Sequence, residues 1–235
     1  MKEETAFLIS NIPVNLTPEK VLMALRLNEE FSEVIRGLID LTHSLIEPRA
    51  LYKISYIDEK GNNKVKIQEV EFTSLVLRKN LDKVGRVFPY VVTIGKKLEK
   101  KISSLNDLME QYFLDRIATM ALSSTVRYLK EYLKEKYKTG PLSGMSPGSL
   151  QDWPITEQRK LFSLLGDVEG MLEVRLTKNL LMIPRKSVSG IFFPSQVLFQ
   201  SCQLCPRKVC PERKAPYNEK LVQQYFGSEN LKKNY

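Results

Sequence analysis

Hydrophobic residues change their spacing several times along the chain, and each spacing predicts one kind of element. Apolar side chains recur every three or four residues over 31–45, which is typical of a helix with one buried face. Alternating or continuous apolar runs over 51–56, 65–70 and 86–94 predict strands. The longest helical pattern covers 106–137. We therefore expect several strands and one long helix that packs against them.

The same mixture returns after an irregular segment. Residues 140–154 hold three glycines, three prolines and three serines, so we expect a loop without regular structure there. A helix is predicted over 156–165, strands over 171–177 and 180–193, and a short helix over 218–226. No strand–helix–strand unit repeats. The pattern predicts an α+β fold, with a twisted, mostly antiparallel or mixed sheet, flanking helices and one long central helix.

Length and composition agree with one globular domain and an appendage. The chain has 235 residues, of which 43% are hydrophobic and 27% charged. We expect a domain over 1–198 and a basic, cysteine-containing C-terminal tail over 199–235 that packs on it. The acidic start is unlike a secretion signal, and no apolar run approaches the ~20 residues of a membrane span. We expect a cytoplasmic protein without a membrane partner.

The net charge of +9 is concentrated in one half of the chain. Residues 1–95 carry 13 basic and 13 acidic side chains, whereas residues 96–235 carry 23 and 14. A basic surface attracts acidic partners, such as a flavodoxin or a ferredoxin. Nucleic acid is not expected, because no nucleic-acid-binding motif accompanies the charge. The alternative is that the charge serves solubility alone.

The single histidine, His43, limits the chemistry that the chain can perform. It argues against zinc sites built on two or three imidazoles and against a Ser-His-Asp hydrolase. Its place in a helical pattern predicts a helix-surface or half-buried position. The chain also lacks the Asp-x-His-x-x-Gly motif by which many proteins bind cobalamin. We assign no catalytic residue, and we expect any cobalamin to be carried by a partner.

Two blocks of sequence and one upstream segment resemble a known family. The resembling residues are Asp115 to Ala118, Ser146 to Pro154 with Gln158, Leu161 and Phe162, then Gly170, Met171, Leu176, Thr177 and Met182 to Phe193. Together they are similar to the S-adenosylmethionine-binding activation domain of cobalamin-dependent methionine synthase, here in a free-standing form. The similarity is clear over 114–194 and looser over 49–95.

The resemblance implies an accessory role for a corrinoid methyltransferase. In that family, cobalamin that has oxidised to an inactive cob(II) state is restored by an electron from a flavodoxin-like donor and a methyl group from S-adenosylmethionine. Such a domain works by placing reactants, so it needs no acid, base or nucleophile of its own. We therefore expect reductive reactivation or methylation of cobalamin on a partner corrinoid protein, with S-adenosylmethionine as the methyl donor.

The resemblance also implies the residues that bind the ligand. Glycine lets the backbone approach a ligand closely, and side chains two apart on a strand share one side. The expected binding residues are Ser146, Pro147, Gly148, Ser149, Ser187, Ser189 and Gly190. The alternative is that Pro-Gly forms an ordinary turn and Ser-Val-Ser-Gly an ordinary strand end.

Three positions depart from the family pattern. Gly144 stands where the family has an arginine, Ser149 where it has a tyrosine, and Thr119 where it has a carboxylate in the long helix. A hydrogen bond to a charged group contributes about 1.5–3 kcal/mol, so losing two weakens binding by at least roughly a hundredfold. Lys178 or Arg185 could replace the missing arginine.

All three cysteines lie within nine residues of the tail, at Cys202, Cys205 and Cys210. Their spacing and basic neighbours suit a zinc ion or an iron–sulfur cluster, although four ligands are usual. The alternative is three unrelated thiols or a redox-labile pair. A second functional hypothesis follows: a metal- or cluster-bearing electron-transfer accessory to a corrinoid protein that does not bind S-adenosylmethionine.

Overall fold

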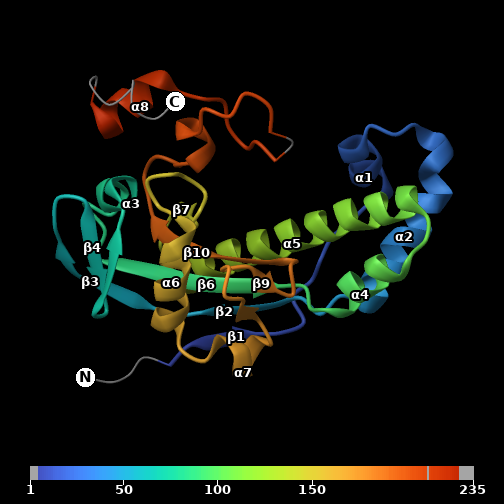
Figure 1. The fold of residues 1–235 in the computed structure, drawn as a ribbon, viewed down its shortest axis with the longest axis horizontal. Helices are drawn as coiled ribbons and strands as arrows, with labels where there is room; N and C mark the ends of the chain where they lie inside the picture. The colour runs from blue at the N-terminus through green and yellow to red at the C-terminus, as the bar shows by residue number, and fades with distance from the viewer. Residues whose placement is uncertain (1–4, 211, 228–235) are drawn as a thin grey trace.

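The computed structural model describes residues 5–210 and 212–227 and confirms the predicted α+β class (Figure 1). Within these residues, one eight-stranded sheet and one two-stranded sheet form, and every strand pairing is antiparallel. The large sheet holds β1 (Phe7–Ile9), β2 (Arg49–Tyr52), β3 (Ser55–Lys60), β4 (Lys64–Ile67), β5 (Val70–Thr73), β6 (Arg86–Thr93), β7 (Leu142–Met145) and β10 (Ser187–Pro194). The small one holds β8 (Arg175–Leu176) and β9 (Met182–Ile183).

Strand β6 is the centre of the large sheet. β2 and β3 pair with successive parts of one edge of β6, β10 pairs with the other edge, and β7 pairs with the far side of β10. All of β6 after Arg86 is buried. A strand that is covered on both faces needs a continuous apolar run rather than an alternating one, which is the pattern in the sequence.

Eight helices and three short 3-10 turns are found in the described residues. They are α1 (Pro18–Leu25), α2 (Ser32–Leu45), α3 (Leu75–Asn80), α4 (Lys97–Ser104), α5 (Leu108–Tyr137), α6 (Gln158–Leu165), α7 (Val168–Leu172) and α8 (Glu219–Phe226), with η1 (Glu29–Phe31), η2 (Ile155–Glu157) and η3 (Ser201–Leu204). The long helix α5 begins at an Asp107 cap, whose carboxylate accepts the N–H groups of Met109 and Glu110.

The sheet separates two apolar layers. On one face, Tyr90, Val92 and Phe192 pack beneath the C-terminal half of α5 through Leu129 and Leu133. On the other face, Val91, Ile191 and Phe193 pack against Trp153 and α6. A third cluster joins α1, α2 and α4 to the N-terminal half of α5. Consecutive residues along β6, and likewise along β10, therefore belong to different layers, because side chains alternate along a strand.

Several predicted boundaries were wrong. The segment 140–154, expected to be irregular, contains β7, which is held because Leu142, Ser143 and Met145 are buried and its backbone pairs with β10. The predicted strand 51–56 is divided between β2 and β3. Within 171–177 only Arg175–Leu176 is strand, because α7 continues to Leu172. His43 is exposed in the last turn of α2, as expected of a helix-surface histidine.

The C-terminal segment, residues 199–210 and 212–227, packs on the rest of the chain. Phe199, Leu204 and Val222 are buried in the same apolar layer as α6. The N–H of Phe199 donates to Ser143 Oγ at 2.8 Å, which ties the segment to β7. The division into a domain over 1–198 and a tail over 199–235 stays a prediction.

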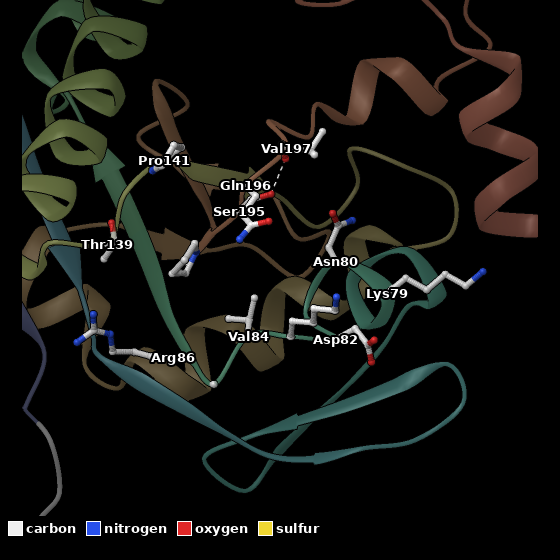
Figure 2. Close-up of a pocket in the computed structure, with 13 residues that line it drawn as sticks. Lys79, Asn80, Asp82, Val84, Arg86, Thr139, Pro141, Ser195, Gln196 and Val197 are labelled. Atoms are coloured by element: carbon white, nitrogen blue, oxygen red, sulfur yellow. Dashed lines mark hydrogen bonds between the residues drawn. The ribbon is translucent and has the colours of Figure 1, made fainter.

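Two further features concern the surface. Among residues 5–210 and 212–227, none of the helices combines the length and the apolar character that crossing a membrane requires. An open cavity of about 750 Å³ lies beside α3 and the end of β10 (Figure 2).

Candidate ligand-binding site

The fold brings the two predicted ligand-binding segments together. β7 leads directly into the 146–149 loop, and its pairing with β10 sets Met145 opposite Ile191. Gly190 therefore lies against the start of the loop. A Cβ atom at Gly190 would stand 2.5 Å from the Met145 carbonyl oxygen and 2.8 Å from Ser146 Oγ. Only glycine permits this approach, so β10 and the loop can meet only because of Gly190.

The 146–149 loop is a tight turn that exposes its tip. The N–H of Gly148 donates to the Trp153 carbonyl at 2.7 Å, and the N–H of Ser149 donates to the Ser146 carbonyl at 3.1 Å. Gly148 and Ser149 are exposed, whereas Pro147 is buried. Gly148 has φ of +81°, a conformation in which a branched side chain is strained. A Gly148→Val variant would therefore disturb the turn as well as any ligand.

Ser187 and Ser189 lie on the same side of β10, and both are buried. The Ser187 hydroxyl donates to Thr93 Oγ1 at 2.9 Å, so it fixes the pairing of β10 with β6. Their side chains belong to the face that carries Ile191, whereas Gly190 opens toward the α5 face. The two serines thus point away from the contact between Gly190 and Ser146. Their role as ligand-binding residues stays a prediction.

Tyr90 completes the junction of the loop and the sheet, and the sequence gives no sign of this role. It lies opposite Gly190 in the register of β6 and β10 and stacks on Phe192, with ring centroids 4.2 Å apart. Burial raises the pKa of the Tyr90 phenol to about 12, although a hydrogen bond with Ser146 lowers it in part. Its buried hydroxyl, held by Ser146, anchors the start of the loop.

The stacked pair Tyr90–Phe192 also explains the departure at Gly144. A Cβ atom at Gly144 would stand 2.9 Å from the Phe192 ring, so an arginine here requires Phe192 to move. The Arg185 Nε donates to Glu99 Oε1 at 2.7 Å, and its replacing the missing arginine stays a prediction. The backbone of Lys178 accepts from Arg159, and no contact of its ammonium group with the 146–149 loop is found in the described residues.

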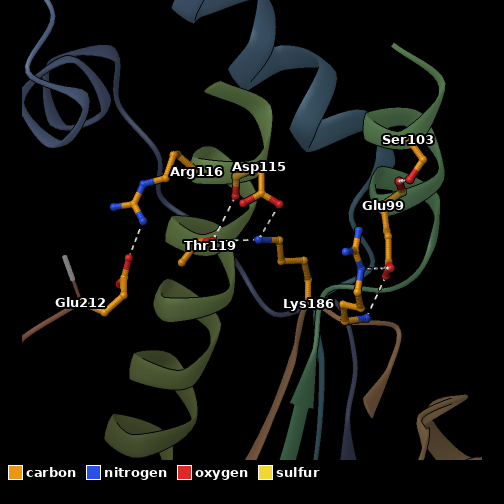
Figure 3. A network of polar contacts seen from close by, with 8 residues as sticks. Glu99, Ser103, Asp115, Arg116, Thr119, Lys186 and Glu212 are labelled. Atoms are coloured by element: carbon orange, nitrogen blue, oxygen red, sulfur yellow. Dashed lines mark hydrogen bonds and ion pairs between the residues drawn. The ribbon is translucent and has the colours of Figure 1, made fainter. Parts of the chain in front are cut away.

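A charged cluster lies between α5 and the start of β10 (Figure 3). The Lys186 ammonium donates to Thr119 Oγ1 at 2.9 Å and pairs with Asp115 Oδ1 at 2.8 Å. Asp115 precedes Thr119 by one helical turn, so the two share a face of α5. A carboxylate is therefore present one turn before the position where the family pattern has one. With Glu99 and Arg185, the pair Asp115–Lys186 lines a small cavity of about 100 Å³.

Part of the resemblance reflects structural support rather than ligand contact. The Asp152 carboxylate accepts the N–H groups of Leu75 and Val76 and the Ser74 hydroxyl, so it caps the N-terminus of α3. Trp153 is fully buried in the layer around α6. These residues fix the base of the 146–149 loop on the sheet. They position the tip of the loop without facing it.

The C-terminal segment contacts both the loop and α5. The Ser149 hydroxyl donates to Ser201 Oγ at 3.2 Å, and Arg116 of α5 forms an ion pair with Glu212 (Figure 3). The Arg213 guanidinium holds the segment in shape. It donates to the backbone carbonyls of Cys202, Cys205, Arg207 and Ala215.

The three cysteines are free and partly buried in this segment. The Cys202 sulfur accepts the N–H of Lys214 at 3.4 Å. No group of three or more His, Cys, Asp or Glu side chains within 5–210 and 212–227 is placed to hold a metal ion. A zinc ion or cluster at Cys202, Cys205 and Cys210 has no geometric support in this structure and stays a prediction. Metal analysis of the purified chain and of Cys205→Ser tests it.

Comparison with known proteins supports the fold. No protein-family model and no curated protein sequence matches the chain. Among solved structures, the chain is similar to the MetH reactivation domain bound to AdoHcy, with a TM-score of 0.56 and 14% identity over 85% of this chain and 82% of that one. The described fold is thus similar to that of a methionine synthase reactivation domain. At this identity the likeness concerns the fold alone.

Proposed function

We propose that this chain is an accessory protein for the reductive reactivation or methylation of cobalamin on a partner corrinoid methyltransferase. The MetH reactivation domain, which has a similar fold, was crystallised with AdoHcy, the product that S-adenosylmethionine leaves after methyl transfer. The observation that carries the proposal is the contact of Gly190 with Met145 and Ser146. It joins the two segments on which the sequence resemblance rests.

The described residues fit S-adenosylmethionine in part. The exposed backbone at Gly148 and Ser149 would hold the adenosyl group, because no side chain at Gly148 blocks access to it. The amino-acid end of the ligand carries one positive and one negative charge, which Asp115 and Lys186, here paired with each other at 2.8 Å, would bind. Bound there, S-adenosylmethionine supplies the methyl group. The chain's own contribution is to place it, so no acid or base is required.

The basic charge of the chain suits an acidic partner that carries cobalamin. Residues 96–235 hold nine more basic than acidic side chains, 23 against 14. The electron donor would be a flavodoxin or a ferredoxin, which are acidic as well. Association governed by exposed charges weakens as salt rises, because such charges are screened beyond ~8–10 Å near physiological ionic strength. We expect this salt dependence for the complex with the corrinoid protein.

Calorimetric titration with AdoHcy tests the ligand. The wild-type chain should bind it, and Lys186→Met should weaken binding at least about tenfold, because a charge-assisted hydrogen bond is lost. Lys20→Met is the matched control, since Lys20 is exposed in α1 and does not line the cavity formed by Asp115 and Lys186. Its affinity should stay unchanged. Wild-type protein that does not bind AdoHcy would remove S-adenosylmethionine from the proposal.

The cobalamin spectrum of a partner tests the function itself. With a low-potential reductant, this protein should speed conversion of the partner's cob(II)alamin to the cob(I) or methylated form. Charge reversal at Arg207 and Lys208 should slow the conversion through the association rate. Arg213 is unsuitable for this variant, because it holds the C-terminal segment. Equal conversion without this protein, for each corrinoid partner tried, would contradict the proposal.

A further inference from the structure

The cavity beside α3 is separate from the candidate ligand-binding site (Figure 2). It lies between the connection from α3 to β6 on one side and the segments around Pro141 and Ser195 on the other. Its volume of about 750 Å³ is within the ~300–1,000 Å³ typical of small-molecule sites. None of its lining residues belongs to the 146–149 loop or to the Asp115–Lys186 cluster.

The lining is strongly positive. Lys79, Lys83 and Arg86 line one wall, and the single carboxylate in the lining is that of Asp82. Asp82 is already paired with Arg78, at 2.8 Å between Oδ1 and Nη1. Among the described residues, no ion pair includes Lys79, Lys83 or Arg86. The Lys79 ammonium donates to the carbonyls of Gln224 and Tyr225, at 3.1 and 2.7 Å. Lys83 and Arg86 are therefore the cations that face this region without a carboxylate to balance them.

Arg86 and Lys83 keep donors for a ligand. One Nη2–H of Arg86 donates to the Tyr137 carbonyl at 3.3 Å, and the guanidinium stacks on the rings of Phe88 and Tyr137. A guanidinium carries five donors in a planar fork, so most of the Arg86 donors remain for a bound anion. Lys83 is exposed. The Lys60 ammonium donates to the carbonyls of Asp82 and Val84, which adds positive charge beside the same wall.

The opposite wall is apolar. Pro141, Pro194 and Val197 line it, and Val197 is 80% exposed although its side chain is aliphatic. Figure 2 shows the side chains of Asn80 and Gln196 between this wall and the cationic one. A ligand with a flat ring and an anionic group would contact both walls, with the ring on the prolines and the anion at Lys83 and Arg86.

We propose that this cavity binds a phosphate-bearing small molecule of nucleotide size. Phosphate suits the cationic wall better than a single carboxylate, because its several oxygens accept from Arg86 and from a lysine at once. The proposal does not depend on the proposed function. It assigns to the chain a second ligand, bound at the opposite end of β10 from Lys186.

Titration of the full chain with ADP, pyrophosphate and adenosine tests the cavity. ADP should bind, pyrophosphate should bind more weakly, and adenosine should show no binding, because it lacks the anion. Lys83→Gln should raise the dissociation constant of ADP at least about tenfold. Arg86→Lys keeps the charge but loses the planar fork, so it should also weaken the binding of ADP. The melting temperature of this variant shows whether its fold is preserved.

The matched control is Lys20→Gln, an exposed lysine of α1 outside the cavity lining. ADP affinity should be unchanged in this variant, and AdoHcy affinity should be unchanged in Lys83→Gln. Equal loss in Lys20→Gln would mean unspecific attraction to a basic protein and would overturn the proposal. The proposal would also be overturned if the wild-type protein bound neither ADP nor pyrophosphate, whether or not it binds AdoHcy.

Discussion

At Gly190 the absence of one side chain decides how closely two segments can lie. The Gly190 backbone contacts the Met145 carbonyl and the Ser146 hydroxyl at distances that leave no room for a Cβ atom. The sequence resemblance points to Gly190. It could not point to Tyr90, because an aromatic residue in an apolar strand carries no signal for a hydrogen bond to a distant loop.

Gly190→Ala should therefore displace the 146–149 loop. The added methyl group must move backbone atoms, which costs about 1–3 kcal/mol of unfolding free energy, and AdoHcy binding should weaken with it. Gly37→Ala is the control, since Gly37 lies exposed in α2 and a Cβ atom there would meet nothing within 4 Å. It should stabilise the protein by about 0.5–1 kcal/mol, because alanine favours helix. Urea unfolding of both variants measures the difference.

The raised pKa of the buried Tyr90 phenol predicts that the protein loses stability at high pH. Its pKa is about 12 in the folded protein and about 10 when the chain is unfolded. The unfolded state therefore loses the phenol proton of Tyr90 first. The contribution of Tyr90 to the free energy of unfolding is complete below about pH 10 and is lost as the pH rises to about 12. The loss amounts to about 2–3 kcal/mol at ~1.36 kcal/mol per pH unit. Tyr90→Phe cannot ionise, so its unfolding free energy should fall less between pH 10 and 12.

At the scale of elements, the least predictable pieces were those held by long-range contacts. Strand β7 lies in a segment rich in glycine and proline. It forms because β10 offers a free edge, and because Leu142 is buried in the layer beneath α5 and Met145 in the layer around α6. The helix α7 follows Gly166 and an Asp167 cap, whose carboxylate accepts the N–H of Gly170 at 2.8 Å. Local patterns describe α5 well, because its 30 residues repeat one helical stripe many times.

The C-terminal segment should depend on Arg213. Its guanidinium donates to several backbone carbonyls at once, and a lysine cannot reproduce this planar fork. Arg213→Lys should therefore increase amide hydrogen exchange over residues 201–215. Arg207→Lys is the control, because the Arg207 side chain is exposed and only its carbonyl accepts from Arg213. Equal exchange in the two variants would contradict a holding role for Arg213.

At the scale of the whole molecule, the C-terminal segment contributes to the core. Phe199, Leu204 and Val222 are buried, and burying each such side chain contributes about 1.5–3 kcal/mol. A chain truncated after Leu198 should therefore lose several kcal/mol of stability and expose an apolar surface. Thermal unfolding followed by circular dichroism measures this loss. An unchanged melting temperature would instead show that the segment is an independent tail.

The sequence by itself predicted the α+β class, the long helix and the two segments of the candidate site. Periodicity and short motifs depend on neighbouring residues, so they can be read without coordinates. Only the tertiary structure decided that Ser187 and Ser189 point away from Ser146, that Asp115 and Lys186 form a pair, and that the cysteines are not gathered around one metal position. It also placed Lys83 and Arg86 at one cavity without a paired carboxylate, although the charges of residues 1–95, from which both come, balance. Such outcomes depend on which distant segments share a surface, and strand pairing settles that.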